Sequence, residues 1–245
     1  AIISDIHEDI INLRQIISRI EKKGFDSLVC LGDISGFSLP YYNYGKTRNA
    51  HECLNLLREK CDIILPGNHD FHAAQRIPES SAVFDFPSNW YELDFRKKYE
   101  MVNGEIWLHE MEDLDPLYRK EDVEFLNSLP EYYILETPGK NILFSHYAYP
   151  NLSGFSKSFY FKEREFQRHF GFMKERNCEI SFMGHAHIGG FYLVTPGKFK
   201  NYRNRKLKLQ GFPVCIGIQP VTSQNNISGF CIFDTESFEL MAVRS

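Results

Sequence analysis

The sequence LPGNHD at residues 65–70 decides how this chain folds, because an apolar run ends there in a glycine and three polar residues. We expect a strand that stops at a reaction centre, followed by a loop on which backbone can approach a ligand closely. The loop places an amide, an imidazole and a carboxylate side by side, at Asn68, His69 and Asp70. The same residues taken alone also fit an ordinary polar turn. The rest of the chain decides between the two.

Four other apolar runs end in the same kinds of side chain. In chain order, all five runs end in Asp5-Ile6-His7, Gly32-Asp33, Gly67-Asn68-His69-Asp70, Ser145-His146 and Gly184-His185-Ala186-His187. Each motif singly has a bland alternative, such as a helix cap, a turn residue or a buried core histidine. In an open α/β sheet, however, sites form beyond the carboxyl ends of the strands. We therefore expect these side chains to converge in one crevice.

Helical patterns separate the first apolar runs. Apolar residues recur at helical spacing from Ile10 to Ile20, Asp9 is placed to cap that helix and Gly24 to end it. Further helices are expected near residues 53–57, 119–128 and 162–176, and mostly antiparallel strands from residue 191 onward. Residues 71–140 are less regular and are expected to form a cap-like region. With no repeat and no clear linker, residues 1–245 are expected to form one α/β domain.

Bulk composition narrows the class of protein. The 245 residues are 43% hydrophobic and 24% charged, which is an ordinary globular composition. The net charge of -4 argues against general binding to nucleic acid or to membrane surfaces. No apolar run approaches the ~18 residues that a membrane span needs.

Cysteine usage and the N-terminus give two more expectations. Six scattered cysteines without a CxxC pair are expected to be reduced core residues of a cytoplasmic protein. The N-terminus has no signal-peptide pattern and no initiating Met, so we expect a few upstream residues to be missing from this chain.

The donor set at the strand ends indicates metal. Imidazoles and carboxylates without thiolate suit Mn, Fe, Zn or Ni rather than a structural zinc. There are too many donors for one ion, whereas two divalent ions that share a bridging carboxylate use three or four protein ligands each. We expect a dinuclear centre, with Mn or Fe ahead of Zn or Ni.

The order of the five motifs resembles that of the calcineurin-like metallophosphoesterases, and within that superfamily the small bacterial-type predicted phosphodiesterases. The resemblance implies a four-layer αββα fold, with two mixed sheets sandwiched between helices. It also implies two ligand sets that share Asp33: Asp5, His7, Asp33 and His187 for the first metal, and Asp33, Asn68, His146 and His185 for the second. His69 would contact the phosphate and assist the leaving group, and Asp70 would orient His69.

The implied reaction is hydrolysis of a phosphoester, in which a metal-bound hydroxide attacks phosphorus in line. The sequence leaves open whether the substrate is a monoester, a diester or a pyrophosphate. The runner-up reading is an inactive scaffold with the same fold, although no ligand is missing here. A nuclease acting on DNA ends would need a broad basic groove, which the acidic balance disfavours. The expected partner is thus a small phosphorylated molecule.

Substrate-facing stretches depart from the family pattern. Glu8 and Asp9 replace the usual Gly and Asn, residues 147–150 replace a small glycine-containing turn, and Val221 stands where the family has an Arg. A basic stretch without acids, either a solvated hairpin tip or a guide for a polyanion, contains Lys198, Lys200, Arg203, Arg205, Lys206 and Lys208.

Loop aromatics lie near the ends of several motifs. They are Tyr41, Tyr42, Tyr44, Tyr147, Tyr149, Phe155 and Phe159. More than half are expected to pack in the core, and some to stack on a nucleobase, which favours nucleotide or dinucleoside polyphosphate substrates. Four histidines fit no motif: His51, His72, His109 and His169.

Overall fold

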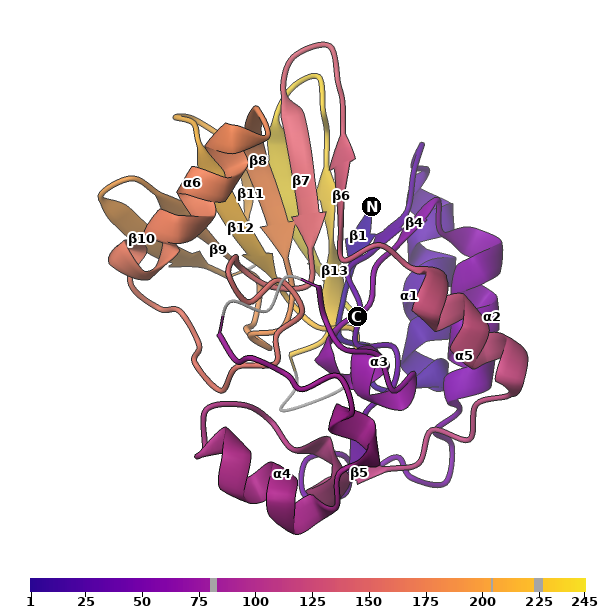
Figure 1. Cartoon of the computed structure of the whole chain (residues 1–245). Coiled ribbons are helices and arrows are strands. Elements are labelled where there is room, and N and C mark those ends of the chain that lie inside the picture. The colour runs from indigo at the N-terminus through magenta and orange to yellow at the C-terminus, as the bar shows by residue number, and fades with distance from the viewer. Residues whose placement is uncertain (80–82, 204, 223–226) are drawn as a thin grey trace.

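Two mixed β-sheets face each other in the computed structural model, which describes residues 1–79, 83–203, 205–222 and 227–245 (Figure 1). Within these residues the first sheet has the order β11-β14-β13-β1-β2-β4 and the second β10-β9-β12-β8-β7-β6. The strands of the first are Lys206–Lys208, Glu239–Arg244, Gly229–Phe233, Ile2–Ile3, Val29–Cys30 and Ile63–Ile64. Those of the second are Lys198–Tyr202, Phe191–Thr195, Val214–Ile218, Cys178–Met183, Asn141–Ser145 and Tyr132–Leu135.

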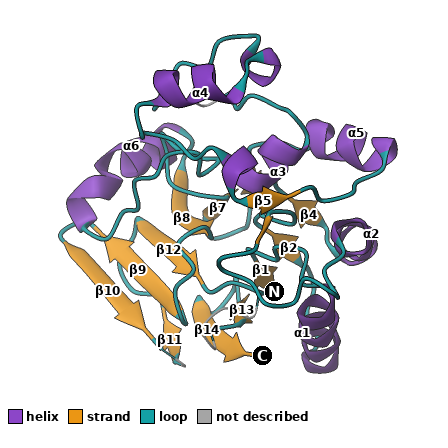
Figure 2. Cartoon of the chain, turned by 90° about the horizontal axis from the view of Figure 1, so that it is seen from below, coloured by secondary structure: helices purple, strands orange, loops and turns teal. Residues whose placement is uncertain are grey.

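Helices cover the outer face of each sheet (Figures 1 and 2). The helices α1 (Ile10–Lys23), α2 (Ala50–Lys60) and α5 (Lys120–Ser128) pack on the first sheet, and α6 (Gln167–Glu175) on the second. The start and end of α1 follow the sequence prediction. The Asp9 carboxylate accepts a hydrogen bond from the Asn12 N–H, and Gly24 ends the helix with a φ of +73°.

Three hydrophobic clusters fill the spaces between these four layers. Leu13, Ile17 and Leu54 from the helices pack on Ile3 of the first sheet. Between the sheets, Ile2, Leu31 and Leu65 meet Phe144, Ile180 and Ile216. Phe166, Phe170 and Met173 cover the outer face of the second sheet. This is the αββα sandwich expected from the sequence. Leu65 lies inside it, so the segment that follows emerges at its edge.

The polar residues after Leu65 do not form the expected loop. Asn68–Ala73 is a short helix, α3, and Asn68, His69 and Asp70 occupy its first turn. A helical turn spaces neighbouring side chains by about 100° around its axis. The three side chains consequently face different parts of the site. The loop predicted from the sequence did not specify these directions.

The region expected to be irregular contains a second helix and a small core of its own. Helix α4 (Phe95–Val102) follows the 3-10 turn Trp90–Glu92 and precedes a second one, His109–Met111. Trp90, Val102 and Ile106 form a separate buried cluster. Beyond it, the strand β5 (Asp113–Leu114) pairs with β3 (Phe37–Ser38), with Asp113 opposite Ser38. This pairing brings residues 113 and 114 of the cap-like region against the segment that follows Asp33.

The basic stretch forms edge strands. β10 is the last strand of the second sheet and β11 the last strand of the first, and most of their lysines are exposed. Charged side chains on edge strands discourage pairing with other chains. Lys206 also pairs with Glu239 at 2.8 Å. The lysines of these two strands therefore lie on exposed sheet edges.

Two further expectations concern cysteines and membranes. All six cysteines are free thiols, and five of them are buried. Among the described residues, no helix is both long enough and apolar enough to cross a membrane.

Candidate metal centre

Asp33 lies at the centre of the polar residues that follow the five predicted strands. Its Oδ2 is 3.1 Å from Nε2 of His146 and 3.9 Å from Nε2 of His7. Its Oδ1 accepts a hydrogen bond from the backbone N–H of His69 at 3.1 Å. A side chain on residue 67 would overlap the Asp33 carboxylate, which explains why a glycine precedes Asn68. The motifs expected to converge do so around one carboxylate.

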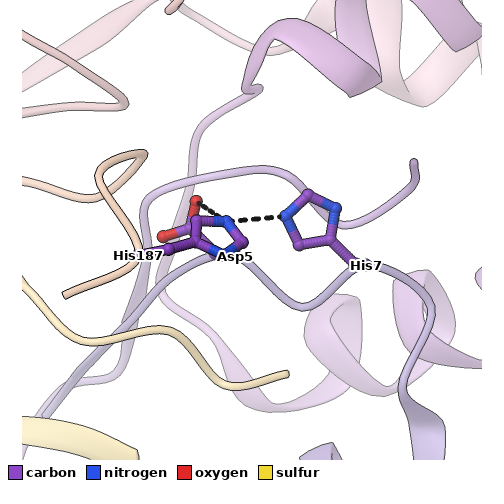
Figure 3. A group of neighbouring side chains, drawn as sticks. All are labelled: Asp5, His7 and His187. Atoms are coloured by element: carbon purple, nitrogen blue, oxygen red, sulfur yellow. Dashed lines mark hydrogen bonds and ion pairs between the residues drawn. The ribbon is translucent and has the colours of Figure 1, made fainter. Parts of the chain in front are cut away.

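Asp5, His7 and His187 form one group on this side of Asp33 (Figure 3). Nε2 of His187 is 3.4 Å from Oδ1 of Asp5 and 3.0 Å from Nε2 of His7. Asp5 is completely buried, and His187 is only partly so. The ligand atoms of the three residues lie within 4.8 Å of one another, a spacing that allows all of them to contact one ion.

Asp33, His146 and His185 form a second group with the same spacing. Nε2 of His146 is 3.2 Å from Nδ1 of His185. The Asn68 carbonyl oxygen, Oδ1, is buried and has no hydrogen-bond partner among the described residues. Because an unpaired buried acceptor is costly, this oxygen has the character of a ligand awaiting a cation.

Backbone carbonyls fix how two of the imidazoles are protonated. Nδ1 of His7 lies 2.9 Å from the Gly36 carbonyl, and Nδ1 of His146 lies 2.9 Å from the Leu31 carbonyl. A carbonyl can only accept, so each Nδ1 donates its proton, and in the neutral ring the lone pair is on Nε2. Both Nε2 atoms lie near the Asp33 carboxylate, 3.9 Å away for His7 and 3.1 Å for His146. Lone pairs facing a carboxylate repel one another unless a cation lies between them, so this donor set fits a metal.

The backbone at the candidate ligands is unusual. Asp5, His7, Asp33, His185 and His187 have φ values of 55°, 47°, 53°, 65° and 46°. Residues other than glycine seldom adopt this left-handed conformation, and it concentrates where function requires a side chain to be aimed. The loops are also tied together: the N–H groups of Ile6 and His7 both donate to the Asp33 carbonyl. The fold thus holds the ligand atoms in place before any ligand arrives.

Local charge sets the protonation states. Burial, followed by the nearby His187, lowers the pKa of His7 to about 3. Burial disfavours ionisation of Asp5, but His187 brings its pKa to about 2. Burial opposes a charge on His146, but the Asp33 carboxylate raises the pKa of that imidazole to about 9.

The carboxylate that contacts the His69 ring is Asp113, and the expectation that Asp70 orients the ring is wrong. Asp113 Oδ2 lies 2.5 Å from Nδ1 of His69. Asp70 instead accepts hydrogen bonds from backbone N–H groups of Ile34, Ser35 and Gly67, which tie the two loops together. Burial opposes a charge on His69, but Asp113 and then Asp33 raise the pKa of its imidazole to about 9.

His109 also belongs to the site, although no motif marked it. Its ring lies 4.3 Å from that of His69, centroid to centroid, and its Nε2 accepts a hydrogen bond of 3.2 Å from the Asn68 amide nitrogen. This bond turns the Asn68 carbonyl oxygen away from His109. The only sequence signal was the acid- and histidine-rich run HEMED at residues 109–113, which lies in a region without periodicity.

The other three histidines without a motif have different surroundings. His51 pairs with Asp122 at 2.7 Å, far along the chain from the strand-end motifs. His169 is buried between the Tyr149 N–H and the Ser181 hydroxyl. His72 lies in a neighbouring hollow behind His69. Of the four, His109 is the one that contacts a candidate ligand.

A pocket opens over these groups. It is lined by His7, Asp33, Ser38, Tyr41, Tyr42, Asn68, His69, Trp107, His109, Glu112, Asp113, Phe159, His185, Ala186 and His187. Of the aromatic residues noted in the sequence, three line this pocket: Tyr41, Tyr42 and Phe159. Tyr147 is fully buried, and the Tyr44 hydroxyl donates to the His7 carbonyl.

Comparisons with known proteins agree with this geometry. The model of the calcineurin-like phosphoesterase family matches residues 1–189. An uncharacterized protein of Methanocaldococcus jannaschii is 27% identical over 250 residues, which cover all of this chain and 86% of that protein.

Solved structures show the same fold. A metallophosphoesterase from Sphaerobacter thermophilus has a TM-score of 0.67 at 18% identity, covering 99% of this chain and 86% of that one. A hypothetical protein from Pyrococcus horikoshii has a TM-score of 0.59 at 13% identity, covering 100% and 86%.

The fold and the cluster of histidines and carboxylates define a hydrolase of phosphoric esters. More particularly, the chain belongs to the calcineurin-like phosphoesterase family.

Proposed function

We propose that this enzyme hydrolyses phosphoesters with a dinuclear metal centre in which Asp33 bridges the two ions. The residues that would hold the first ion are Asp5, His7, Asp33 and His187, and those for the second are Asp33, Asn68, His146 and His185. The observation that carries the proposal is the convergence of imidazole nitrogens on the Asp33 carboxylate, with Nε2 of His146 at 3.1 Å and Nε2 of His7 at 3.9 Å. Two groups of donors flank that carboxylate, and each has the size of a single-ion site.

The donor chemistry favours Mn or Fe, with Zn or Ni as alternatives. Every candidate donor is an imidazole, a carboxylate or an amide oxygen, and no cysteine takes part in the groups found among the described residues. Such donors suit borderline and harder divalent ions. When bound, two such ions would activate a water molecule and neutralise charge on the phosphoryl oxygens.

The protein's own residues would then position and protonate. His69 lines the pocket, and the Asp113 bond to Nδ1 leaves Nε2 as the nitrogen able to donate to the leaving oxygen. His109 holds the Asn68 amide so that Oδ1 is available for the second ion. Asp70 fixes the loops after Asp33 and Leu65 relative to each other. His69 is thus assigned as the proton donor to the leaving group, and Asp113 as the residue that orients the His69 ring.

The substrate would be a small phosphorylated molecule, with nucleotides as one class. A scaffold that kept the fold and lost the chemistry would be expected to lose ligands, whereas all seven candidate ligands lie around Asp33 or in the group beside it. The ligand set therefore favours catalysis over a scaffold role.

The test combines metal content with turnover. Protein loaded with Mn²⁺ or Fe²⁺ and freed of excess ions is expected to retain about two ions per chain by elemental analysis and to hydrolyse an aryl phosphoester. Protein stripped by a chelator is expected to lose turnover and to recover it on reloading. Two bound ions without turnover on monoesters, diesters or nucleotides would support the scaffold reading instead.

A further inference from the structure

Two antiparallel segments build an aromatic wall on the His185 side of the pocket. The Trp107 N–H donates to the Phe155 carbonyl at 2.9 Å, and the Lys157 N–H donates to the Glu105 carbonyl at 3.0 Å. These bonds place the rings of Trp107 and Phe159 6.4 Å apart, centroid to centroid. Phe159 stacks on the His185 ring at 5.0 Å and 21°, and 36% of it remains exposed.

A second aromatic pair lies on the His7 side. Tyr42 packs against the His7 ring at 5.1 Å and is nearly buried. Its neighbour Tyr41 lines the same pocket and is 56% exposed. Exposed rings next to a reaction centre offer flat apolar faces to a substrate. An aromatic substituent could therefore stack on either side of the metal groups.

The charge of the pocket is also one-sided. Among the described residues that line it, there is no Lys or Arg, whereas Asp33, Glu112 and Asp113 contribute carboxylates. The residues outside the described ranges are Ser, Ala, Asn and Gln, which carry no charge. Asp33 lies among the metal donors and Asp113 is engaged with His69, which leaves Glu112 as the carboxylate of the lining that neither group uses.

The net charge of the ester determines how strongly the Glu112 carboxylate repels it. A phosphomonoester carries close to two negative charges near neutral pH, whereas a diester carries one. Two ions at the centre would attract both kinds of ester. The carboxylate of Glu112, with no lining Lys or Arg to offset it, adds a repulsion that grows with the second charge.

We infer that, within the proposed function, the preferred substrate is a phosphodiester that carries a flat aromatic group such as a nucleoside. Trp107 and Phe159 receive that group, and Glu112 disfavours monoesters and terminal phosphates. Water cleaves one P–O bond: its oxygen stays on phosphorus, and the leaving oxygen departs as an alcohol after it receives a proton. The product is a monoester, which the same carboxylate helps to expel.

Lys157 is the competing anchor for a more highly charged substrate. Its ammonium lies over the Trp107 ring, 5.3 Å from the centroid, and is outside the lining of the pocket. If Lys157 bound a terminal phosphate, Lys157→Ala would lower turnover of monoesters and nucleoside polyphosphates. Our inference expects this variant to leave the preference for diesters in place.

Three esters with the same 4-nitrophenolate leaving group separate charge from stacking. They are 4-nitrophenyl phosphate, methyl 4-nitrophenyl phosphate and thymidine 5′-(4-nitrophenyl phosphate), all assayed with the Mn²⁺-loaded protein. Glu112→Gln is expected to raise kcat/KM for the monoester relative to the methyl diester by about threefold, and less at high salt. Phe159→Leu and Trp107→Leu are expected to lower kcat/KM for the thymidine diester relative to the methyl diester by about tenfold.

Matched controls use residues far from the pocket lining. Glu92 is exposed like Glu112, and Phe95 is 40% exposed, close to the value for Phe159. Glu92→Gln and Phe95→Leu are expected to leave all three ratios unchanged. Binding is read separately: thymidine is expected to quench the tryptophan fluorescence of the wild type and not that of Trp107→Leu.

The possible results distinguish a failure of the substrate preference from a failure of the proposed function. Absence of hydrolysis for all three esters would contradict the proposed function, and the fluorescence titration would still decide whether Trp107 receives a base. Hydrolysis with ratios that do not respond to Glu112→Gln or to the aromatic variants would overturn this inference alone. A loss of monoester turnover in Lys157→Ala would also overturn it.

Discussion

Asp113 Oδ2 lies 2.5 Å from Nδ1 of His69, although 44 residues separate the two in the chain. The contact exists because β5 pairs with β3, which begins four residues after Asp33, and so places Asp113 opposite Ser38. Gly36 completes the arrangement: its φ of +94° and the absence of a side chain let the His69 ring pack directly against the backbone. A strand pairing, rather than a motif, thus determines how the ring is held.

Asp113→Asn is expected to lower kcat about 10- to 100-fold, because the amide would no longer stabilise and aim the protonated ring. Metal content should stay near that of the wild type. The alkaline limb of the kcat/KM profile should move to lower pH, because a proton donor loses activity above its pKa and Asp113 raises the pKa of His69. Asp115→Asn, a change at an exposed neighbour, serves as the control. An unchanged pH profile in Asp113→Asn would reject the positioning role.

His69→Ala is expected to keep normal metal content and to lose turnover by roughly 10²-fold or more, because it removes the donor to the leaving oxygen. Elemental analysis and steady-state kinetics on the same preparation measure both quantities. Esters with better leaving groups, which need less protonation, should lose less activity. A parallel fall in metal content would instead identify His69 as a ligand.

Asp33→Asn is expected to weaken binding of both ions, by at least about tenfold, because Oδ2 of Asp33 lies 3.1 Å from His146 of one donor group and 3.9 Å from His7 of the other. Competition with a chelator, followed by elemental analysis, measures the affinity. Asp85→Asn, at an exposed aspartate, is the control. Loss of one ion only, with the other bound as before, would show that Asp33 does not bridge.

His169 gives a pH-dependent contribution to stability that is separate from the metal groups. Burial lowers the pKa of His169 to about 3, against about 6.5 in the unfolded chain. The folded pKa is the lower of the two, so this contribution is present above pH 6.5 and is lost as pH falls toward 3. Between pH 7 and pH 5 the loss amounts to about 2 kcal/mol.

His169→Gln removes that titration. The free energy of unfolding is measured by urea at pH 7 and at pH 5, with both proteins treated with a chelator. Its fall between the two pH values should be about 2 kcal/mol smaller in His169→Gln than in the wild type. Chelation keeps bound ions from masking the difference. Equal pH dependence in the two proteins would mean that His169 is not buried as a neutral ring.

The parts of the site that could be predicted from the sequence are those in which a short local pattern places the residue at the end of a strand. Asp33, His146 and His185 follow directly from the rule that polar residues at the carboxyl ends of buried strands converge. The helices α1 and α5 were also predictable, α1 from periodicity and caps and α5 from the spacing of its apolar residues. The resemblance to a family led correctly to the αββα fold and to membership of the calcineurin-like phosphoesterases. The assignment of individual ligands to each ion remains a proposal.

Other features had no local pattern. Asn68, His69 and Asp70 begin a helix, so adjacent residues serve different neighbours, and Asp70 does not reach the His69 ring. His109 and Trp107 come from a region whose aromatic and charged residues carry no period. Such residues reach the pocket through contacts between segments far apart in the chain, and single-sequence patterns do not encode those contacts.

The sequence by itself therefore determined which chemistry the strand ends carry, because strand direction and residue type are local properties. Only the tertiary structure decided what surrounds that chemistry. It replaced Asp70 with Asp113 beside His69, added His109 behind Asn68, and set Glu112 and the aromatic wall over the pocket. The physical reason is that the LPGNHD stretch fixes its own side chains, whereas their partners arrive by strand pairing and packing across 40 or more residues.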